Sequence, residues 1–189
     1  NVIRTVDGDN YLVDEDGDYW RTYIFIEDAT CFDIVEKPED FYNSALSFGN
    51  FQRLLADYPA ATLHETIPNF HNTVSRFADF TRAVEEDVMK RASSVQEEIR
   101  FVLDREPDTH VICDALAKGR LPLRVTHNDT KLNNIMIDNK TGKGLCVIDL
   151  DTVMPGSALY DYGDSIRFGA STGAEDEKNL DLISCDLKL

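Results

Sequence analysis

Four polar residues in the second half of the chain have the types and the spacing that phosphoryl transfer needs. His127, Asp129 and Asn134 follow the spacing H-x-D-x-x-x-x-N in the segment THNDTKLNN, and Asp149 ends the apolar run LCVID. A carboxylate at Asp129 can accept the proton of an attacking hydroxyl and hold that hydroxyl in line with a γ-phosphate. Asn134 and Asp149 offer the hard oxygen ligands that Mg²⁺ prefers. The pattern therefore predicts a general base beside a magnesium site.

The spacing matches the catalytic loop and metal aspartate of protein-kinase-like phosphoryl transfer. Lys131 can place a positive charge beside the transferring phosphoryl group, and we expect His127 to brace the loop rather than to do acid–base work. The alternative is that these are ordinary turn residues, since Asn and Asp favour loops through local hydrogen bonds. The position of the motif between two short strands favours the catalytic interpretation.

Short strands and helices must position this loop. The runs LRVT, NIMI and LCVID read as strands around the turn NKTGKG, which predicts a hairpin with polar residues at its ends. A helix is expected from Pro38, with one apolar face formed by Phe41, Ala45, Phe48, Phe51, Leu54 and Leu55. Further helices are predicted at residues 77–91, at 94–105 with a capping box of Ser94 and Glu97, and at 108–118 before Gly119.

The first residues read as short antiparallel strands joined by turns at Asp7-Gly8 and Asp16-Gly17. The last of these runs, YWRTYIFI, is read as one strand. The aspartates between Asp14 and Asp18 suggest a calcium loop, but Gly17 comes too early for one and Phe25 stands where the closing glutamate belongs. We therefore reject calcium binding there.

Composition and charge exclude several classes of partner. The 189 residues include 19 Lys and Arg against 35 Asp and Glu, a net charge of -16. Such a charge repels nucleic acids and anionic membranes. No apolar stretch is long enough to span a bilayer and no signal peptide is recognisable, so a cytoplasmic protein is expected. The four separated cysteines fit neither a disulfide framework nor a zinc site, which favours reduced core thiols.

Longer stretches resemble a known family. RVTHNDTKLNNIMI, CVIDLDTVMPGS and DYGDSIRFGAS resemble the N-acetylhexosamine 1-kinases within the aminoglycoside-phosphotransferase family, and the similarity continues through FIED, SFGNFQ and ETIPNFHNT. This resemblance implies an α+β, protein-kinase-like fold. It also implies ATP- and Mg²⁺-dependent phosphorylation of the C1 hydroxyl of N-acetylglucosamine or N-acetylgalactosamine.

The resemblance also implies roles for single residues. Asp129 is the general base, Asn134 and Asp149 are metal ligands, and Asp151 is a second-metal or supporting carboxylate. Thr130 is a candidate sugar contact.

The same resemblance makes the strand end Phe25, Ile26 and Glu27 the hinge whose backbone pairs with adenine, with Met136 as an apolar floor under the base. Asp161 and Asp164 are expected to tie their segment back to the catalytic loop, and Arg167 to hold a carboxylate or a substrate oxygen. His71 has two candidate roles, capping a helix or contacting the sugar, and neither is assigned.

A kinase of this type also needs a glycine-rich loop over the phosphates and further helices for its substrate, and no such loop precedes Asp129. We therefore expect residues 1–27 to be the last strands of an N-terminal lobe with its hinge, and 28–189 the first part of a C-terminal lobe. The missing parts of both lobes would belong to the same enzyme. By itself the chain is expected to be almost inactive.

Three alternatives stay open. The acceptor can be choline, an aminoglycoside or another sugar, because such enzymes share the catalytic loop and differ in the acceptor pocket. The chain can also be a catalytically silent binding module, although its intact base and metal ligands argue against that. A third possibility is metal-dependent hydrolysis by clustered carboxylates, which would need no ATP.

Overall fold

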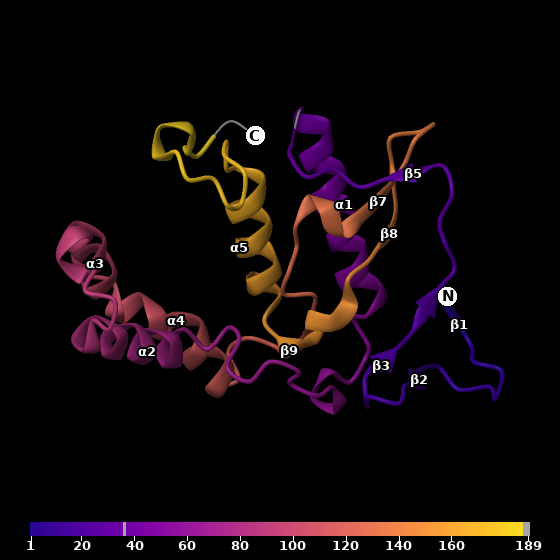
Figure 1. Ribbon diagram of the computed structural model, residues 1–189, viewed down its shortest axis with the longest axis horizontal. Coiled ribbons are helices and arrows are strands. Elements are labelled where there is room, and N and C mark those ends of the chain that lie inside the picture. The colour runs from indigo at the N-terminus through magenta and orange to yellow at the C-terminus, as the bar shows by residue number, and fades with distance from the viewer. Residues whose placement is uncertain (36, 187–189) are drawn as a thin grey trace.

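The segment that carries the H-x-D-x-x-x-x-N motif is built on short antiparallel strands, in a computed structural model that describes residues 1–35 and 37–186. Strands β5 (Ala29–Thr30), β7 (Ile135–Asp138) and β8 (Gly144–Val147) form a three-stranded sheet in the order β5-β7-β8. The predicted hairpin is confirmed as β7 and β8. Strand β6 (Arg124–Thr126) does not join it, and pairs instead with β9 (Met154–Gly156). The catalytic loop thus runs between two separate small sheets (Figure 1).

Helix α1 (Pro38–Leu54) covers one face of the hairpin. Ile135 and Ile137 alternate with Met136 along β7, and together with Phe48 they form the buried core against which Phe32 and Val147 pack. Pro38 suits the first turn of the helix, because its missing N–H would have no partner there. The predicted apolar face is wrong in part. Ala45 and Leu54 are exposed, while a serine, Ser44, is buried at 2% exposure.

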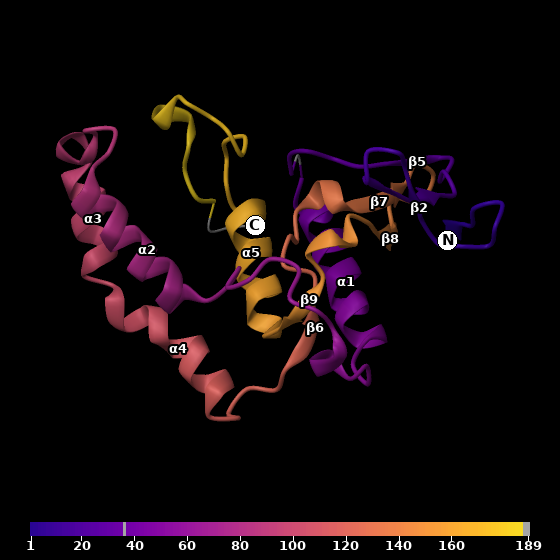
Figure 2. The same ribbon diagram turned by 60° about the horizontal axis from the view of Figure 1, so that its bottom comes forward.

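Helices α2 (Thr73–Glu86), α3 (Gln96–Leu103) and α4 (Glu106–Ala117) are grouped on one side of the molecule, away from the sheet (Figures 1 and 2). Helix α2 begins earlier than predicted because the side chain of Asn72 caps it, accepting from the Ser75 N–H at 3.1 Å. The capping box predicted for α3 is absent. Ser94 instead belongs to a 3-10 helix, Ala92–Ser94, where its hydroxyl donates to the Arg91 carbonyl at 2.8 Å.

The N-terminal strands are antiparallel, as predicted. Strand β1 (Val2–Ile3) pairs with β4 (Thr22–Tyr23), and β2 (Leu12–Val13) with β3 (Tyr19–Trp20). The run YWRTYIFI is not one strand, since it is broken at Arg21 and ends at Tyr23. The proposed lobe boundary at residue 27 therefore falls in irregular chain before β5. The Asp14 carboxylate accepts from the Asp16 and Asp18 N–H groups at 3.0 and 2.9 Å, which closes the turn between β2 and β3.

The structure shows a mixed α+β protein with five α-helices in its described part. None of those helices is long and apolar enough to cross a membrane. The cysteines in this part of the chain are all free, but the expectation of core thiols is wrong for Cys185, which is exposed.

Helix α5 (Ala158–Gly169) packs against α1 and offers a direct test of this contact. A Cβ at Gly169 would overlap the ring of Phe41 on α1, whereas a Cβ at Gly163 meets nothing within 4 Å. We expect Gly169→Ala to lower the free energy of unfolding by about 1–3 kcal/mol through overpacking. The control Gly163→Ala should raise it by up to about 1 kcal/mol, because alanine favours the helix. Urea unfolding of both variants measures this, and equal effects would contradict the packing of α5 on α1.

Candidate active site

Two aspartates of helix α5 hold the loop that carries the motif through hydrogen bonds to its backbone. The carboxylate of Asp161 accepts from the backbone N–H groups of His127 at 3.0 Å and Asn128 at 2.8 Å. Asp164, one turn further along the helix, accepts from the Thr130 N–H at 2.7 Å. The prediction that these two aspartates tie their segment to the catalytic loop is confirmed. Their spacing on one helix face explains why both reach the same loop.

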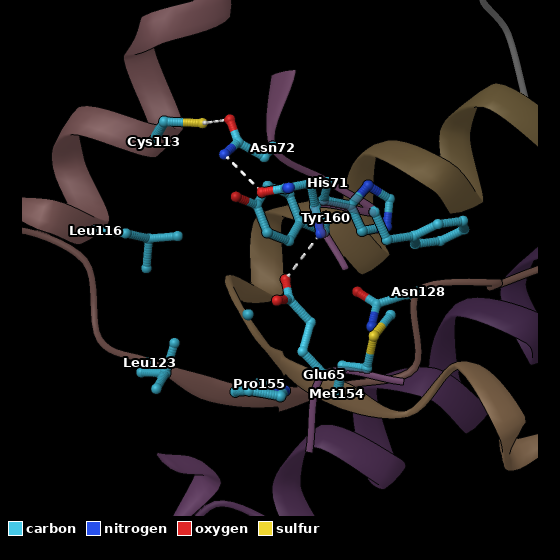
Figure 3. A pocket seen from close by; sticks show the side chains of 13 residues that line it. Glu65, His71, Asn72, Cys113, Leu116, Leu123, Asn128, Met154, Pro155 and Tyr160 are labelled. Carbon is cyan, nitrogen blue, oxygen red and sulfur yellow. Dashed lines mark hydrogen bonds between the residues drawn. The ribbon is translucent and has the colours of Figure 1, made fainter. Parts of the chain in front are cut away.

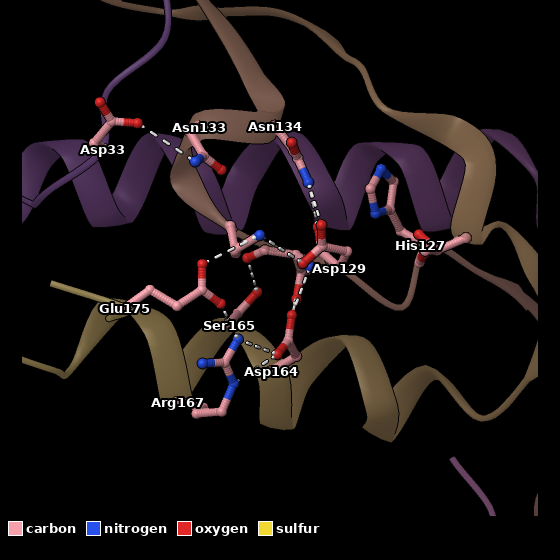
Figure 4. Close-up of polar contacts among 12 residues, drawn as sticks. Asp33, His127, Asp129, Asn133, Asn134, Asp164, Ser165, Arg167 and Glu175 are labelled. Atoms are coloured by element: carbon pink, nitrogen blue, oxygen red, sulfur yellow. Dashed lines mark hydrogen bonds and ion pairs between the residues drawn. The ribbon is translucent and has the colours of Figure 1, made fainter. Parts of the chain in front are cut away.

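Asp129 projects from this loop as a half-buried carboxylate whose two oxygens have different neighbours (Figure 4). Its Oδ2 accepts from the amide Nδ2 of Asn134 at 2.9 Å. Its Oδ1 lies 3.4 Å from the ammonium of Lys131. The arrangement therefore presents a fixed carboxylate that is able to receive a proton.

Lys131 stands between two acidic side chains. Its Nζ lies 3.4 Å from Asp129 and 3.3 Å from Oε2 of Glu175, a residue of the segment after α5. Burial by itself would lower the pKa of Lys131, but the charge of Asp129 and the hydrogen bond and charge of Glu175 outweigh it. The pKa therefore lies above its ordinary value of 10.5. The side chain is thus a permanent cation beside the candidate base.

Asn134 and Asp149 are brought to the same end of the hairpin. The Asn134 amide donates to both the carbonyl and the carboxylate of Asp129, which turns its Oδ1 away from them. The Ile148 N–H donates to the Asn134 carbonyl at 2.9 Å, so Asp149 follows directly after a residue bonded to the loop. Asp149 itself has a left-handed backbone, with φ 56° and ψ 63°. Such a conformation is unfavourable outside glycine and is often found at functional sites.

The donor atoms of these two residues fit a magnesium ion. They are an amide oxygen and an exposed carboxylate, and neither is the acceptor of a hydrogen bond within residues 1–35 and 37–186. Over the same residues, no group of three or more His, Cys, Asp or Glu side chains converges as a metal cage. Mg²⁺ commonly takes one or two protein ligands and completes its shell with phosphate oxygens and water. The set is therefore suitable for a metal that arrives with a nucleotide.

His127 is fully buried and does not face the site (Figure 4). Its ring lies edge-on to Phe48 and Phe51 of α1, with ring centroids 5.3 and 5.7 Å apart. Its Nε2 bonds to the Ile148 carbonyl at 2.9 Å, and its own carbonyl accepts from Thr152 at 2.7 Å. This histidine holds the loop, the hairpin and α1 together, in the bracing position expected of it.

Three predicted site residues have other partners. Thr130 is only 1% exposed and its hydroxyl donates to the Asp161 carbonyl at 2.8 Å, while the sugar contact expected of it stays a prediction. Arg167 holds a carboxylate, donating from Nε to Asp164 at 2.9 Å. Asp151 is exposed and forms an ion pair with Arg21 of the N-terminal strands.

The residues predicted to contact adenine lie in two separate segments of the chain. Phe25, Ile26 and Glu27 are irregular rather than the end of a strand, and none of their backbone groups makes a backbone hydrogen bond within the described chain. Met136 is half-buried on the face of β7 opposite the core, with its sulfur 3.2 Å from that of Cys31.

A cavity of about 550 Å³ opens in front of Asp129. Its walls come from Asn128 and Asp129 of the loop, from α5, and from the segment before α2 that carries Phe70 and His71. Glu175 closes one side of it and also lies 3.6 Å from Arg167. No motif in the sequence points to Glu175, because one glutamate in an acidic segment gives no signal. It left His71 unassigned.

The geometry is that of a carboxylate base, a neighbouring cation and hard oxygen donors on one rigid loop beside a cavity. The model of the phosphotransferase enzyme family, APH, matches residues 3–181, which is nearly the whole chain. The chain therefore belongs to the phosphotransferase enzyme family.

Proposed function

We propose that this protein is a kinase of protein-kinase-like fold that transfers the γ-phosphoryl group of ATP to the C1 hydroxyl of an N-acetylhexosamine. The observation that carries the proposal is Asp129, held by Asn134 and Lys131 at the edge of the 550 Å³ cavity. A carboxylate so placed acts on a bound hydroxyl, and membership of the family supplies phosphoryl transfer as its reaction.

The chemical step follows from these positions. The acceptor oxygen forms a bond to the γ-phosphorus while the bond from that phosphorus to the β,γ-bridging oxygen breaks, and ADP leaves. The hydroxyl proton passes to Asp129, which must be within hydrogen-bond reach of that hydroxyl. Lys131 stabilises the negative charge on the transferring group. Lys131 must then lose part of its contact with Glu175, because one ammonium group cannot pair fully with both the Glu175 carboxylate and the transferring phosphoryl group.

Magnesium and the nucleotide are assigned to the residues that fit them. Asn134 Oδ1 and the Asp149 carboxylate would hold Mg²⁺, which neutralises the charge of the phosphates when bound. Asp151 would support a second ion once released from Arg21. The backbone of Phe25, Ile26 and Glu27 would pair with adenine, with Met136 beneath it. His127 would act by positioning the loop.

The choice of sugar has separate support. The stretches around the catalytic loop and DYGDSIRFGAS resemble the N-acetylhexosamine 1-kinases, and the cavity at Asp129 is within the ordinary size range of small-molecule sites.

An acceptor panel tests the proposal. The full-length protein is incubated with ATP, Mg²⁺ and N-acetylglucosamine, N-acetylgalactosamine, choline or an aminoglycoside, and the products are identified by mass spectrometry. We expect a sugar phosphate from at least one N-acetylhexosamine. Phosphorylation of choline or an aminoglycoside alone would replace the proposed acceptor. Release of ADP without any phosphorylated acceptor would point to hydrolysis and contradict the kinase assignment.

A further inference from the structure

Glu175 lies between two cations at the edge of the cavity in front of Asp129 (Figure 4). Its Oε2 is 3.3 Å from the ammonium of Lys131, and its Oε1 is 3.6 Å from the guanidinium of Arg167. The same ammonium is 3.4 Å from Asp129. A single lysine therefore pairs with both Glu175 and the candidate base.

The local charges are unevenly matched. Three carboxylates, those of Asp129, Asp164 and Glu175, share the two cations Lys131 and Arg167. Arg167 is already paired with Asp164 at 2.9 Å. Phosphate oxygens form strong charge-assisted hydrogen bonds with lysine and arginine. A phosphate group that reaches this loop must therefore share these two cations with the carboxylates that already hold them.

The smaller recess beside this cavity is unsuited to an anion (Figure 3). It has a volume of about 250 Å³ and shares a wall that contains His71 and Asn128 with the larger cavity. His71 Nε2 and Asn128 Oδ1 are buried without a hydrogen-bond partner in the described chain, and both are acceptors. No lysine or arginine among the described residues lines the recess, whereas Glu65 does. The cations available to an oxyanion beside Asp129 therefore lie on the side of the larger cavity.

The segment after α5 carries Glu175 and leaves its side chain room to turn. The segment folds back on itself, with the Thr172 N–H donating to the Ser184 carbonyl at 3.0 Å. The side chain of Glu175 is 49% exposed. Glu175 and Arg167 also line a separate cavity of about 190 Å³. The carboxylate can thus move away from Lys131 while the backbone contacts of the segment stay in place.

We propose that Glu175 forms an autoinhibitory contact, in which its carboxylate competes with the terminal phosphate of ATP for Lys131 and Arg167. This inference rests on the function proposed above for the use of ATP, and not for the identity of the acceptor. Both anions need the same cations and repel each other, so each weakens the hold of the other on the site. The contact therefore lowers the affinity of the protein for ATP.

Glu175→Gln tests the proposal, because it removes the charge and keeps the size of the side chain. The full-length protein is titrated by calorimetry with Mg²⁺ and a non-hydrolysable ATP analogue, without any acceptor. We expect the Kd to fall by about fivefold. KM for ATP should fall in parallel with little change in kcat, because Glu175 is already displaced once the nucleotide is bound.

Two further variants separate this contact from a general effect of charge. Asp176→Asn removes one charge from the neighbouring, exposed residue and should keep the wild-type Kd. In a Lys131→Met background, Glu175→Gln should lose most of its effect, because the contested cation is gone. An equal fall in Kd for Glu175→Gln and Asp176→Asn, or a full effect without Lys131, would overturn the proposed contact.

The wild type and Glu175→Gln also distinguish this inference from the proposed function. An unchanged or higher Kd in Glu175→Gln would overturn the autoinhibitory contact and leave the kinase assignment intact. A lower Kd in that variant, with no phosphorylation of an N-acetylhexosamine by the wild type, would support the contact and contradict the proposed acceptor. A wild-type protein that does not bind the ATP analogue would contradict both.

Discussion

Replacing Asp129 by asparagine is expected to lower kcat of the full-length protein by about 10²–10⁴-fold, the usual contribution of a general base. The substitution keeps the shape of the side chain and an oxygen that can accept from Asn134 Nδ2, so the loop should stay in place. What it removes is the capacity to take a proton and the charge that faces Lys131. Because Asp129 accepts the proton in the transition state and not on binding of the sugar, the substitution should change KM for the sugar far less than kcat.

Steady-state measurement of ADP release with and without sugar gives both constants. Asp57→Asn is the matched control, since Asp57 is exposed in the turn after α1 and far along the chain from the loop. It should behave as the wild type. A kcat for Asp129→Asn within a few-fold of the wild-type value would show that another group accepts the proton.

The largest loss of stability is expected from Asp161→Ala. Asp161 is only 4% exposed, and its carboxylate accepts from the N–H groups of His127 and Asn128 and from the side chain of Gln52. Its removal leaves two buried backbone donors unpaired, each costing about 1–3 kcal/mol. We expect the free energy of unfolding in urea to fall by about 3–5 kcal/mol. Asp176→Ala, an exposed aspartate after α5, is the control and should stay within about 0.5 kcal/mol.

The pH dependence of that stability has a definite sign. Burial raises the pKa of Asp161 above its ordinary value of 3.8, and the hydrogen bonds from Asn128, His127 and Gln52 offset this only in part. A carboxyl group with a raised pKa stabilises the folded state most when protonated, and that contribution is lost as pH rises through the folded pKa. The wild type should therefore exceed Asp161→Ala in free energy of unfolding by an amount that becomes smaller as the pH rises from 3. A difference that widens over that range would show that the hydrogen bonds outweigh burial.

The sequence was most informative where chemistry and local geometry coincide. The spacing from His127 to Asn134 places the candidate base and one candidate metal ligand on the same short loop, and two apolar runs around a turn predict the hairpin that follows. The tie of Asp161 and Asp164 to this loop was also expected, and it spans residues far apart in the chain.

Inferences that depend on tertiary contacts were less successful. Thr130 lies next to Asp129 in sequence, but no local pattern predicts that its hydroxyl donates to the Asp161 carbonyl. Glu175 reaches Lys131 only because the chain after α5 folds back over the loop, and no local pattern predicts that return. The capping box at Ser94 failed because a 3-10 turn competed for the same hydroxyl. Unpaired buried atoms such as Nε2 of His71 can be recognised only in a folded structure.

The most direct test of the proposed activity is the position of the phosphate on the product. The full-length protein, ATP, Mg²⁺ and N-acetylglucosamine are incubated together, and the sugar phosphate is examined by ³¹P and ¹H NMR. Phosphorylation at C1 predicts coupling between phosphorus and the anomeric proton, together with loss of the reducing end. Phosphate on any other carbon, or no sugar phosphate at all, would contradict the assignment.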